Sequence, residues 1–284
     1  MVSVIIAAHN EAPVLGATLD ALLRAAPDAE VIVVPNGCTD ETAQVARSRE
    51  GVTVVELEKG SKPLAMNAGD EVARTFPRIY LDADIIVPPG GVAALERALE
   101  RPGVHAAVPG RFMDCSGRPW PVRAWVSVHR RLPVFRDALF GRGMIALSAE
   151  GRSRFEEFPP MVADDLFLDG MYSSDEKTEV AEVRVVVESP ASTGELLHRL
   201  IRVRRGSAAM RGAAQQGEVP ISIRPARRWS WLVDVVFKDP RLAPAGVVYA
   251  TITTAAAVSA RLQRRGSMDW GRRAARQSLD QRAA

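Results

Sequence analysis

Two aspartates separated by one residue, Asp82 and Asp84, are the side chains best suited to chemistry, because they follow the apolar residues of an expected strand at 79–82. Two carboxylates at a strand end can share Mg²⁺ or Mn²⁺ with a bound diphosphate, since these hard cations prefer oxygen ligands and leave coordination positions open. A metal held there would neutralise a departing diphosphate. Taken alone, the Asp-x-Asp pattern is also compatible with a simple turn.

Three further polar loops are expected at the same place as Asp82 and Asp84. Residues 7–11 (AAHNE), 34–40 (VPNGCTD) and 59–69 (KGSKPLAMNAG) each follow a strand-like run. Four polar or glycine-containing loops that arrive together are harder to explain as solvated turns than any one of them. The sequence therefore predicts a binding site at one edge of a sheet.

The elements that must position these loops alternate between strand and helix. Residues 2–8, 30–34, 52–57 and 79–82 are apolar runs typical of buried strands, and 13–26, 39–50 and 64–75 have helical spacing of apolar residues. Thr39 or Asp40 is a plausible cap for the second helix. Such alternation predicts an α/β fold with a mostly parallel sheet flanked by helices, whose ligands bind at the carboxyl ends of the strands.

Beyond residue 105 the pattern is less regular. We expect strands at 106–109, 144–148 and 179–188, a loop with one short helix at 114–133, a helix at 164–171 and a basic helix at 196–214. There is no internal repeat and no low-complexity linker.

Composition indicates a globular protein with an uneven charge. The chain has 284 residues, 47% of them hydrophobic, and its two cysteines, Cys38 and Cys115, have no metal-ligand spacing. Residues 1–198 carry 20 Lys and Arg against 29 Asp and Glu, whereas 199–284 carry 17 against 5, a balance of −9 followed by +12. The N-terminus shows no basic leader or cleavage site, so we expect a cytoplasmic protein, with possible peripheral contact between the basic third and the anionic cytoplasmic face of the membrane.

Residues 242–260 carry no charge and precede a cluster of arginines. Because the stretch is rich in Ala, Thr and Ser and contains Pro244 and Gly246, it favours a helix docked on the protein over an interfacial or a membrane-spanning one. Trp229, Trp231 and Trp270 lie among arginines, where packing is favoured over stacking on nucleic-acid bases or membrane anchoring. We expect no nucleic-acid partner.

The residues 4–11, 36–40, 62–69 and 82–84 resemble the successive motifs of family 2 glycosyltransferases with the GT-A fold. The resemblance is specific over about residues 1–100 and thinner to about residue 206. It implies that the N-terminal half binds a nucleotide sugar, such as a UDP- or GDP-sugar, and that Asp84, with Asp82, holds Mg²⁺ or Mn²⁺. The residues implied in nucleotide-sugar binding are Ala8, His9, Glu11, Asn36, Lys62, Asn67, Asp82 and Ala83.

The same resemblance implies a catalytic base in the acidic pair Asp164 and Asp165. An inverting transfer needs a carboxylate that takes the proton of the acceptor hydroxyl, and Asp165 is our choice for that role. Asp164 can then serve as the cap of the helix that begins there, since carboxylates are favoured in a first turn.

Three more residues are assigned to the acceptor or the diphosphate. Gly143 lies in a glycine-containing stretch at 140–144, where the backbone allows close approach of a ligand, although a simple turn is equally compatible. Arg202 and Arg205, three residues apart on the basic helix, could face one anionic group or form a solvated face. The family's Gln-x-x-Arg-Trp motif is absent there, His9 replaces a frequent aromatic residue, and Pro35-Asn36 replaces a frequent acidic pair.

The sequence thus favours a metal-dependent inverting glycosyltransferase. Its GT-A domain would span 1–206, with a nucleotide-sugar half at about 1–100 and an acceptor half at about 101–206, followed by a basic, mostly helical region at 207–284. The acceptor would be a glycan, a lipid-linked sugar or a small molecule. Two alternatives stay open: a sugar-phosphate nucleotidyltransferase, although the Gly-rich loop expected after its first strand is missing, and a non-enzymatic protein that binds anionic ligands or membranes.

Overall fold

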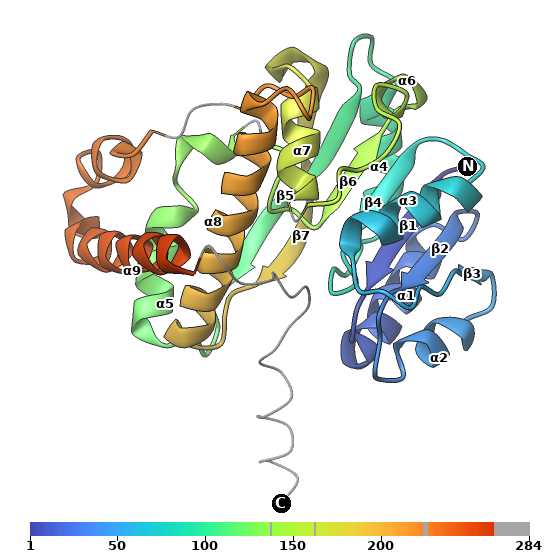
Figure 1. Cartoon of the computed structure of the whole chain (residues 1–284), viewed down its shortest axis with the longest axis horizontal. Helices are drawn as coiled ribbons and strands as arrows, with labels where there is room; N and C mark the ends of the chain where they lie inside the picture. The colour runs from blue at the N-terminus through green and yellow to red at the C-terminus, as the bar shows by residue number, and fades with distance from the viewer. Residues whose placement is uncertain (137, 162, 224–226, 264–284) are drawn as a thin grey trace, which may run out of the picture.

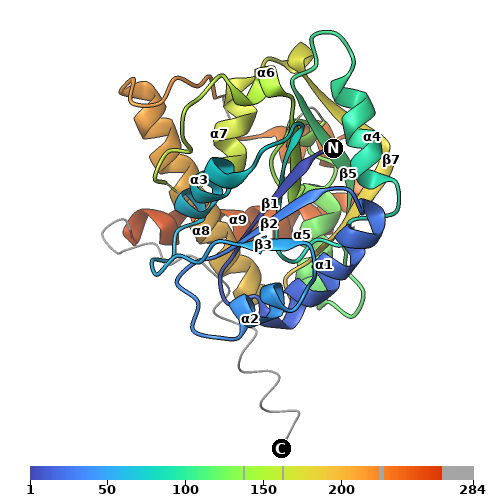
Figure 2. The same cartoon turned by 90° about the vertical axis from the view of Figure 1, so that its right-hand side faces the viewer.

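A seven-stranded sheet with helices on both faces forms the centre of the molecule (Figures 1 and 2). The structure is a computed structural model and describes residues 1–136, 138–161, 163–223 and 227–263. The strands are β1 (Ser3–Ala8), β2 (Glu30–Pro35), β3 (Val52–Val54), β4 (Arg78–Leu81), β5 (Ala106–Asp114), β6 (Met144–Leu147) and β7 (Lys177–Glu188). Their order is β3-β2-β1-β4-β6-β5-β7, and among the described pairings only those of β6 are antiparallel. The predicted mostly parallel sheet is confirmed.

The alternation of side chains along β1 shows how the sheet separates two cores. Val4, Ile6 and Ala8 pack into a cluster with α1, α2 and α4, whereas Ile5 and Ala7 pack into a cluster with α3, α7 and α8. Successive side chains of a strand point to opposite faces, so a continuous apolar run can be buried on both sides. These helices are α1 (Ala12–Ala25), α2 (Thr42–Arg47), α3 (Lys62–Val72), α4 (Gly91–Leu99), α7 (Asp164–Met171) and α8 (Thr193–Gln215).

A third cluster joins the C-terminal region to the sheet domain. It contains residues of α5 (Trp120–His129), the first turns of α8, the π-helical turn η3 (Trp231–Val236) and α9 (Ala243–Leu262). In Figure 1, α5, α8 and α9 lie together on the side away from β2 and β3. Short helical segments at η1 (Pro133–Phe135), α6 (Ala149–Arg152), η2 (Ser174–Glu176) and η4 (Pro240–Leu242) complete the described elements.

Helix α9 is docked on the protein through one face. Gly246, Tyr249, Ile252, Ala256 and Ala260 are buried against the neighbouring helices, which confirms docking of this stretch. Its other face is exposed, and the segment Pro240–Leu262 is the one described helix long and apolar enough to cross a membrane, with only 17% of its most apolar window buried. Residue Trp270 lies outside the described residues.

Several element boundaries differ from the sequence prediction. The helix expected at 39–50 is shorter, because the Asp40 carboxylate accepts hydrogen bonds from the backbone and hydroxyl of Thr42 (3.1 and 2.5 Å) and holds residues 39–41 in a turn. Glu41, not Thr39 or Asp40, is the N-cap residue. Strand β5 runs five residues beyond the predicted end at Pro109, because a register shift between Pro109 and Gly110 lets it continue beside β7. Helix α8 passes through residue 206, so the two predicted parts of the chain share one helix.

Candidate active site

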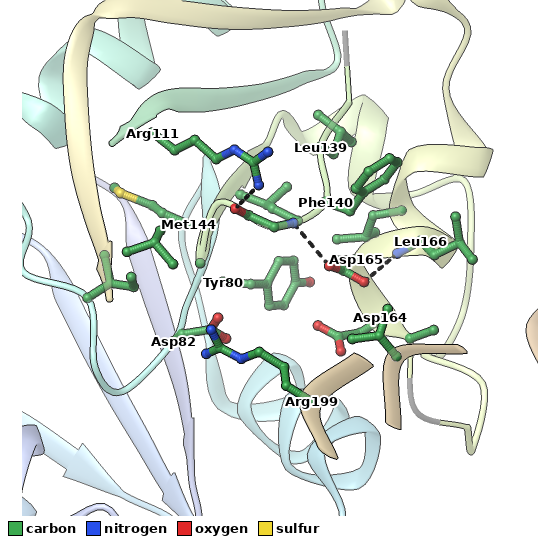
Figure 3. Close-up of a pocket in the computed structure, with 18 of the residues that line it drawn as sticks. Tyr80, Asp82, Arg111, Leu139, Phe140, Met144, Asp164, Asp165, Leu166 and Arg199 are labelled. Carbon is green, nitrogen blue, oxygen red and sulfur yellow. Dashed lines mark hydrogen bonds between the residues drawn. The ribbon is translucent and has the colours of Figure 1, made fainter. Parts of the chain in front are cut away.

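A cavity of about 530 Å³ lies where β4 ends, bounded by α5, α7, α8 and the segment that precedes β6 (Figure 3). One lysine and four aspartates predicted from the sequence line it together. They are Lys62, Asp82, Asp84, Asp164 and Asp165. Because these come from three separate parts of the chain, the fold brings the two acidic pairs to one place, as the resemblance implied.

Lys62 links the two acidic pairs. Ser61 caps α3 by accepting a hydrogen bond from the Leu64 backbone, so Lys62 is the first residue of the helix and its side chain projects from the helix start. Its Nζ lies 2.8 Å from Asp82 Oδ1 and 2.9 Å from Asp164 Oδ2. Burial alone would lower the pKa of Lys62, but the Asp164 and Asp82 carboxylates outweigh it and raise that pKa, so the amine stays charged.

Asp165 has the properties of a general base. Its Oδ2 accepts a hydrogen bond from the Gly141 backbone (3.1 Å) and its Oδ1 accepts one from the Leu166 backbone (2.8 Å), as Figure 3 shows. Burial, followed by the charge of neighbouring Asp164, raises the pKa of Asp165 to about 6, against the opposing effects of Lys62 and Gly141. A carboxylate with a pKa near the working pH can both take and release a proton.

Asp164 does not cap α7. The N-cap residue is Ala163, no side chain caps the helix, and the Asp164 carboxylate is paired with Lys62 instead. Ala163 has a φ of +152°, which is rare for a residue with a side chain, and this turn directs both aspartates into the cavity. The prediction of Asp164 as a cap is therefore wrong, because a buried lysine offers its carboxylate a stronger partner than a helix terminus.

Gly143, the residue before β6, supports Asp82. The Gly143 carbonyl accepts a hydrogen bond from the Asp82 backbone (2.8 Å), and Gly143 has a φ of +69°. A Cβ at this position would lie 2.5 Å from Ile85 and 3.2 Å from Asp82 Oδ2. A glycine is favoured here because of the positive φ and because a Cβ would overlap the Ile85 side chain.

Two carboxylates suit a divalent cation whose remaining ligands come from a substrate. Asp82 and Asp84 line the cavity together, and no group of three His, Cys, Asp or Glu in the described ranges could hold a metal ion without other ligands. Hard oxygen donors fit Mg²⁺ or Mn²⁺, and the oxygens of a diphosphate could complete the coordination.

The loops after β1 and β2 are held together by the side chains predicted to bind a nucleoside. Asn36 is fully buried; its Nδ2 donates to the carbonyls of Ala8 and Val34 (both 3.0 Å), and its Oδ1 accepts from the Ser61 backbone (2.9 Å). His9 Nδ1 lies 2.7 Å from the Asn36 carbonyl oxygen. Thus the Asn36 amide is occupied by backbone groups of β1, of β2 and of the segment that precedes α3.

The other residues of the β1, β2 and α3 region that were predicted to bind the nucleotide sugar also lie outside the cavity lining. Asn67 exchanges two hydrogen bonds with the Phe158 backbone (3.2 and 2.8 Å), and the Ala83 carbonyl accepts a hydrogen bond from Thr18 (2.8 Å). Glu11 precedes α1, and its backbone donates to Thr42 Oγ1 (2.9 Å). None of Ala8, His9, Glu11, Asn36, Asn67 and Ala83 is a lining residue of the cavity.

Three arginines of α8 line the cavity, and one of them was predicted from the sequence. Arg202 is a lining residue but Arg205 is not, and Arg199 and Arg211 line the cavity as well. Burial, then the charge of Arg199, lowers the pKa of Arg202, whereas Asp82 and Glu11 raise it, which places this cation electrostatically close to both acids. Arg199 could have been found from the Arg-x-x-Arg-x-x-Arg spacing at 199–205.

Three further lining residues were missed by the sequence analysis: Arg111 of β5, and Trp125 and His129 of α5. In the sequence, His129 has no partner at metal-ligand spacing. In the structure its ring stacks on Trp125, with centroids 4.1 Å apart. No local pattern marks these residues, since the strand was expected to end before Arg111 and the helix was only partly recognised.

Comparison with known proteins identifies a family and a shared fold. The family described as "Glycosyl transferase family 2" matches residues 3–146. Among solved structures, the mannosyltransferase PcManGT from Pyrobaculum calidifontis, in complex with GDP-Man and Mn²⁺, matches 94% of this chain and 76% of its own, with 20% identity and a TM-score of 0.60. TarS 1–349 from S. aureus, in complex with UDP-GlcNAc, matches 66% of this chain but only 58% of its own, with 15% identity and a TM-score of 0.52. No curated protein sequence matches the chain.

Proposed function

Because the chain belongs to glycosyl transferase family 2 and is a glycosyltransferase, we propose that it transfers a sugar from a nucleotide sugar with inversion, in a metal-dependent reaction. The observation that carries the proposal is the single cavity that holds Asp165, with its raised pKa, beside Lys62, Asp82 and Asp84. It offers a base and a diphosphate site at the same place.

Asp165 takes the proton of the acceptor hydroxyl. As that oxygen bonds to the anomeric carbon, the bond between this carbon and the diphosphate oxygen breaks, and the electron pair leaves with the nucleoside diphosphate. Asp84 and Asp82 would hold Mg²⁺ or Mn²⁺, which supplies positive charge against the leaving diphosphate. PcManGT was solved with Mn²⁺, which supports this cofactor class.

The other charges of the cavity assist the leaving group. Lys62 keeps its proton and fixes the Asp82 carboxylate. Arg199 and Arg202 approach from α8, where guanidinium groups pair well with phosphate oxygens. Arg205 is assigned to the same diphosphate or acceptor region. Unlike Arg199, it is not a lining residue of the cavity.

The nucleoside would lie outside the cavity, at the ends of β1 and β2. Ala8, His9, Glu11, Asn36, Asn67 and Ala83 then contribute to donor binding by shaping this surface, with Asn36 acting through the loops that it connects. UDP- and GDP-sugars are both candidate donors, since the two structural neighbours carry one of each kind.

We also propose a cytoplasmic protein that touches the anionic membrane face peripherally. Trp229, Val233 and Phe237 near η3 and Val247 and Val258 on α9 are exposed apolar side chains. Basic residues border them at Arg227, Arg228, Lys238, Arg241 and Arg261. Such a surface favours anionic lipid headgroups. The proposed division of the chain remains a GT-A domain at 1–206 and a basic region at 207–284.

The test is a screen of UDP- and GDP-sugars for donor hydrolysis with and without Mn²⁺. We expect one donor to be hydrolysed only with metal, and the Asp165→Asn variant to bind that donor without turnover. Asp175→Asn, on an exposed turn, is the matched control. Unchanged turnover in Asp165→Asn would remove the base assignment. Release of pyrophosphate from a nucleoside triphosphate and a sugar phosphate would indicate a nucleotidyltransferase instead, and a lack of any nucleotide binding would indicate a non-enzymatic protein.

A further inference from the structure

The cavity changes chemical character away from the carboxylates. Its lining there includes Met113, Trp125, Leu196 and Leu200, which all belong to the hydrophobic cluster of α5, α8 and α9. Binding against such walls becomes more favourable with each part of an apolar ligand surface that they remove from water. A glycan covered with hydroxyl groups would gain little from this end, whereas an apolar body would fill it favourably.

The aromatic rings at the apolar end stack on one another and carry no charge. The Trp125 ring lies between His129, at 4.1 Å, and Tyr249 of α9, at 5.6 Å between centroids. Burial, then the charge of Arg111, lowers the pKa of His129 to about 3, so its imidazole is neutral at ordinary pH. This end of the cavity therefore favours an apolar part of a ligand. Arg111 is a cation close to it.

Arg111 carries unused hydrogen-bonding capacity. Its guanidinium lies 3.9 Å from the centre of the Phe135 ring, and its Nη1 donates to the Gly141 carbonyl (3.2 Å). Its Nη2 is buried and makes no hydrogen bond within the part of the chain that the structure describes. A buried donor without a partner is unfavourable, and an anionic oxygen is the acceptor that a guanidinium pairs with best.

Gly141 fixes the spacing between this arginine and the proposed base. Its carbonyl accepts from Arg111, while its N–H donates to Asp165 (3.1 Å), as the dashed lines in Figure 3 show. A Cβ at Gly141 would lie 2.9 Å from Arg111 Nη1, so the close approach depends on glycine. One residue separates the two side chains, and a ligand that meets both must carry its anionic group only a few bonds from its hydroxyl.

We propose that the acceptor is a hydroxylated apolar acid. Its apolar body occupies the end formed by Met113, Trp125, Leu196 and Leu200, and its carboxylate or phosphate pairs with Arg111. Its hydroxyl then faces Asp165, loses its proton to that carboxylate and forms the new bond to the sugar, while the nucleoside diphosphate leaves with the electron pair. This inference rests on the proposed glycosyl transfer, because it assigns the acceptor of that reaction.

Calorimetry with the whole chain, without donor, tests the inference using four probes. They are 3-hydroxydecanoate, 3-hydroxy-2-naphthoate, the neutral 1,3-decanediol and the short acid 3-hydroxybutyrate. We expect at least one of the first two to bind about tenfold or more tightly than both of the last two, and the better of them distinguishes an alkyl chain from a fused ring. Equal affinity for the acids and the diol, or no binding of either apolar acid, would overturn the proposal.

Two variants test the contact with the anionic group and the contact with the apolar body separately. Arg111→Gln should weaken binding of the apolar acids about tenfold and leave the diol unchanged, whereas Arg97→Gln, on the exposed face of α4, should change neither. Leu200→Gln should weaken the apolar acids and leave 3-hydroxybutyrate unchanged. Identical affinities of Arg111→Gln and the natural chain would also contradict the inference.

Donor hydrolysis, measured in parallel, distinguishes the two proposals. If an apolar acid binds but no nucleotide sugar is cleaved with Mn²⁺, the glycosyl transfer fails while the anion site stands. If the donor is cleaved but no apolar acid binds, the acceptor assignment fails alone.

Discussion

The carboxyl ends of β1 and β2 and the carboxyl end of β4 carry loops of similar polarity, yet their polar side chains do different work. At the first two ends, Asn36 and Asn10 bond to backbone groups of neighbouring loops. At the end of β4, the carboxylate of Asp82 faces a cavity and meets Lys62 and, through it, Asp164. One region stabilises the edge of the sheet, and the other presents charge to a ligand.

This difference shows that polarity at a sheet edge does not by itself identify a ligand contact. A buried amide must find partners, and Asn36 finds all of them within the protein. The Asp82 and Asp164 carboxylates both pair with Lys62, so negative charge is concentrated at the end of β4 and not at the ends of β1 and β2. Four measurements can break or sharpen the comparison.

The largest expected effect is on catalysis at the cavity. Asp165→Asn should lower transfer by about 10² to 10⁴-fold, because a general base typically contributes that much. Donor affinity should stay close to that of the natural chain, measured by calorimetry with the nucleotide sugar and Mn²⁺. A loss of affinity equal to the loss of rate would show that Asp165 binds the donor and does not act as the base.

The next largest effect is on metal-dependent donor binding. Asp84→Ala should remove the gain in donor affinity that Mn²⁺ provides, about 100-fold, since a bound metal contributes several kcal/mol of charge stabilisation. Titration of the donor with and without Mn²⁺ measures this gain directly. Asp28→Ala, exposed beyond α1, should keep the full gain. A gain that survives Asp84→Ala would place the metal elsewhere.

A smaller effect concerns the pH profile. With a pKa of about 6, Asp165 must be ionised to act as a base, so kcat/KM should fall as the pH drops below about 6. Lys62 lowers the pKa of Asp165, so Lys62→Met should raise that pKa and move the acid limb to higher pH. The comparison variant is Lys59→Met, exposed on the same loop. An unmoved limb in Lys62→Met would show that another group controls the profile.

The smallest effect on turnover is expected at Asn36. Asn36→Ala removes the three hydrogen bonds between the Asn36 side chain and backbone groups of Ala8, Val34 and Ser61, so the free energy of unfolding should fall by about 1–3 kcal/mol, measured by urea denaturation. The rate at saturating donor should change little. If stability were unchanged and the KM for the donor rose instead, the Asn36 side chain would contact the nucleoside and the contrast between the two edges would disappear.

Much of the fold could be predicted because its elements follow local periodicity. The helix expected at 164–171 is α7 residue for residue, and the buried strand at 2–8 differs from β1 by one position. The extension of β5 could not be predicted, since it depends on pairing with β7, about 70 residues later in the chain.

The sequence by itself determined the alternating fold, the family resemblance and the acidic pairs that meet in the cavity, because apolar period and polar motifs are local properties of the chain. Only the tertiary structure decided what each polar group does. Burial beside Asp164 raises the pKa of Asp165, internal partners occupy the Asn36 amide, and Arg111, Trp125 and His129 become cavity walls. Burial and the available hydrogen-bond partners depend on residues distant in sequence. Residue type and spacing alone therefore do not determine what each polar group does.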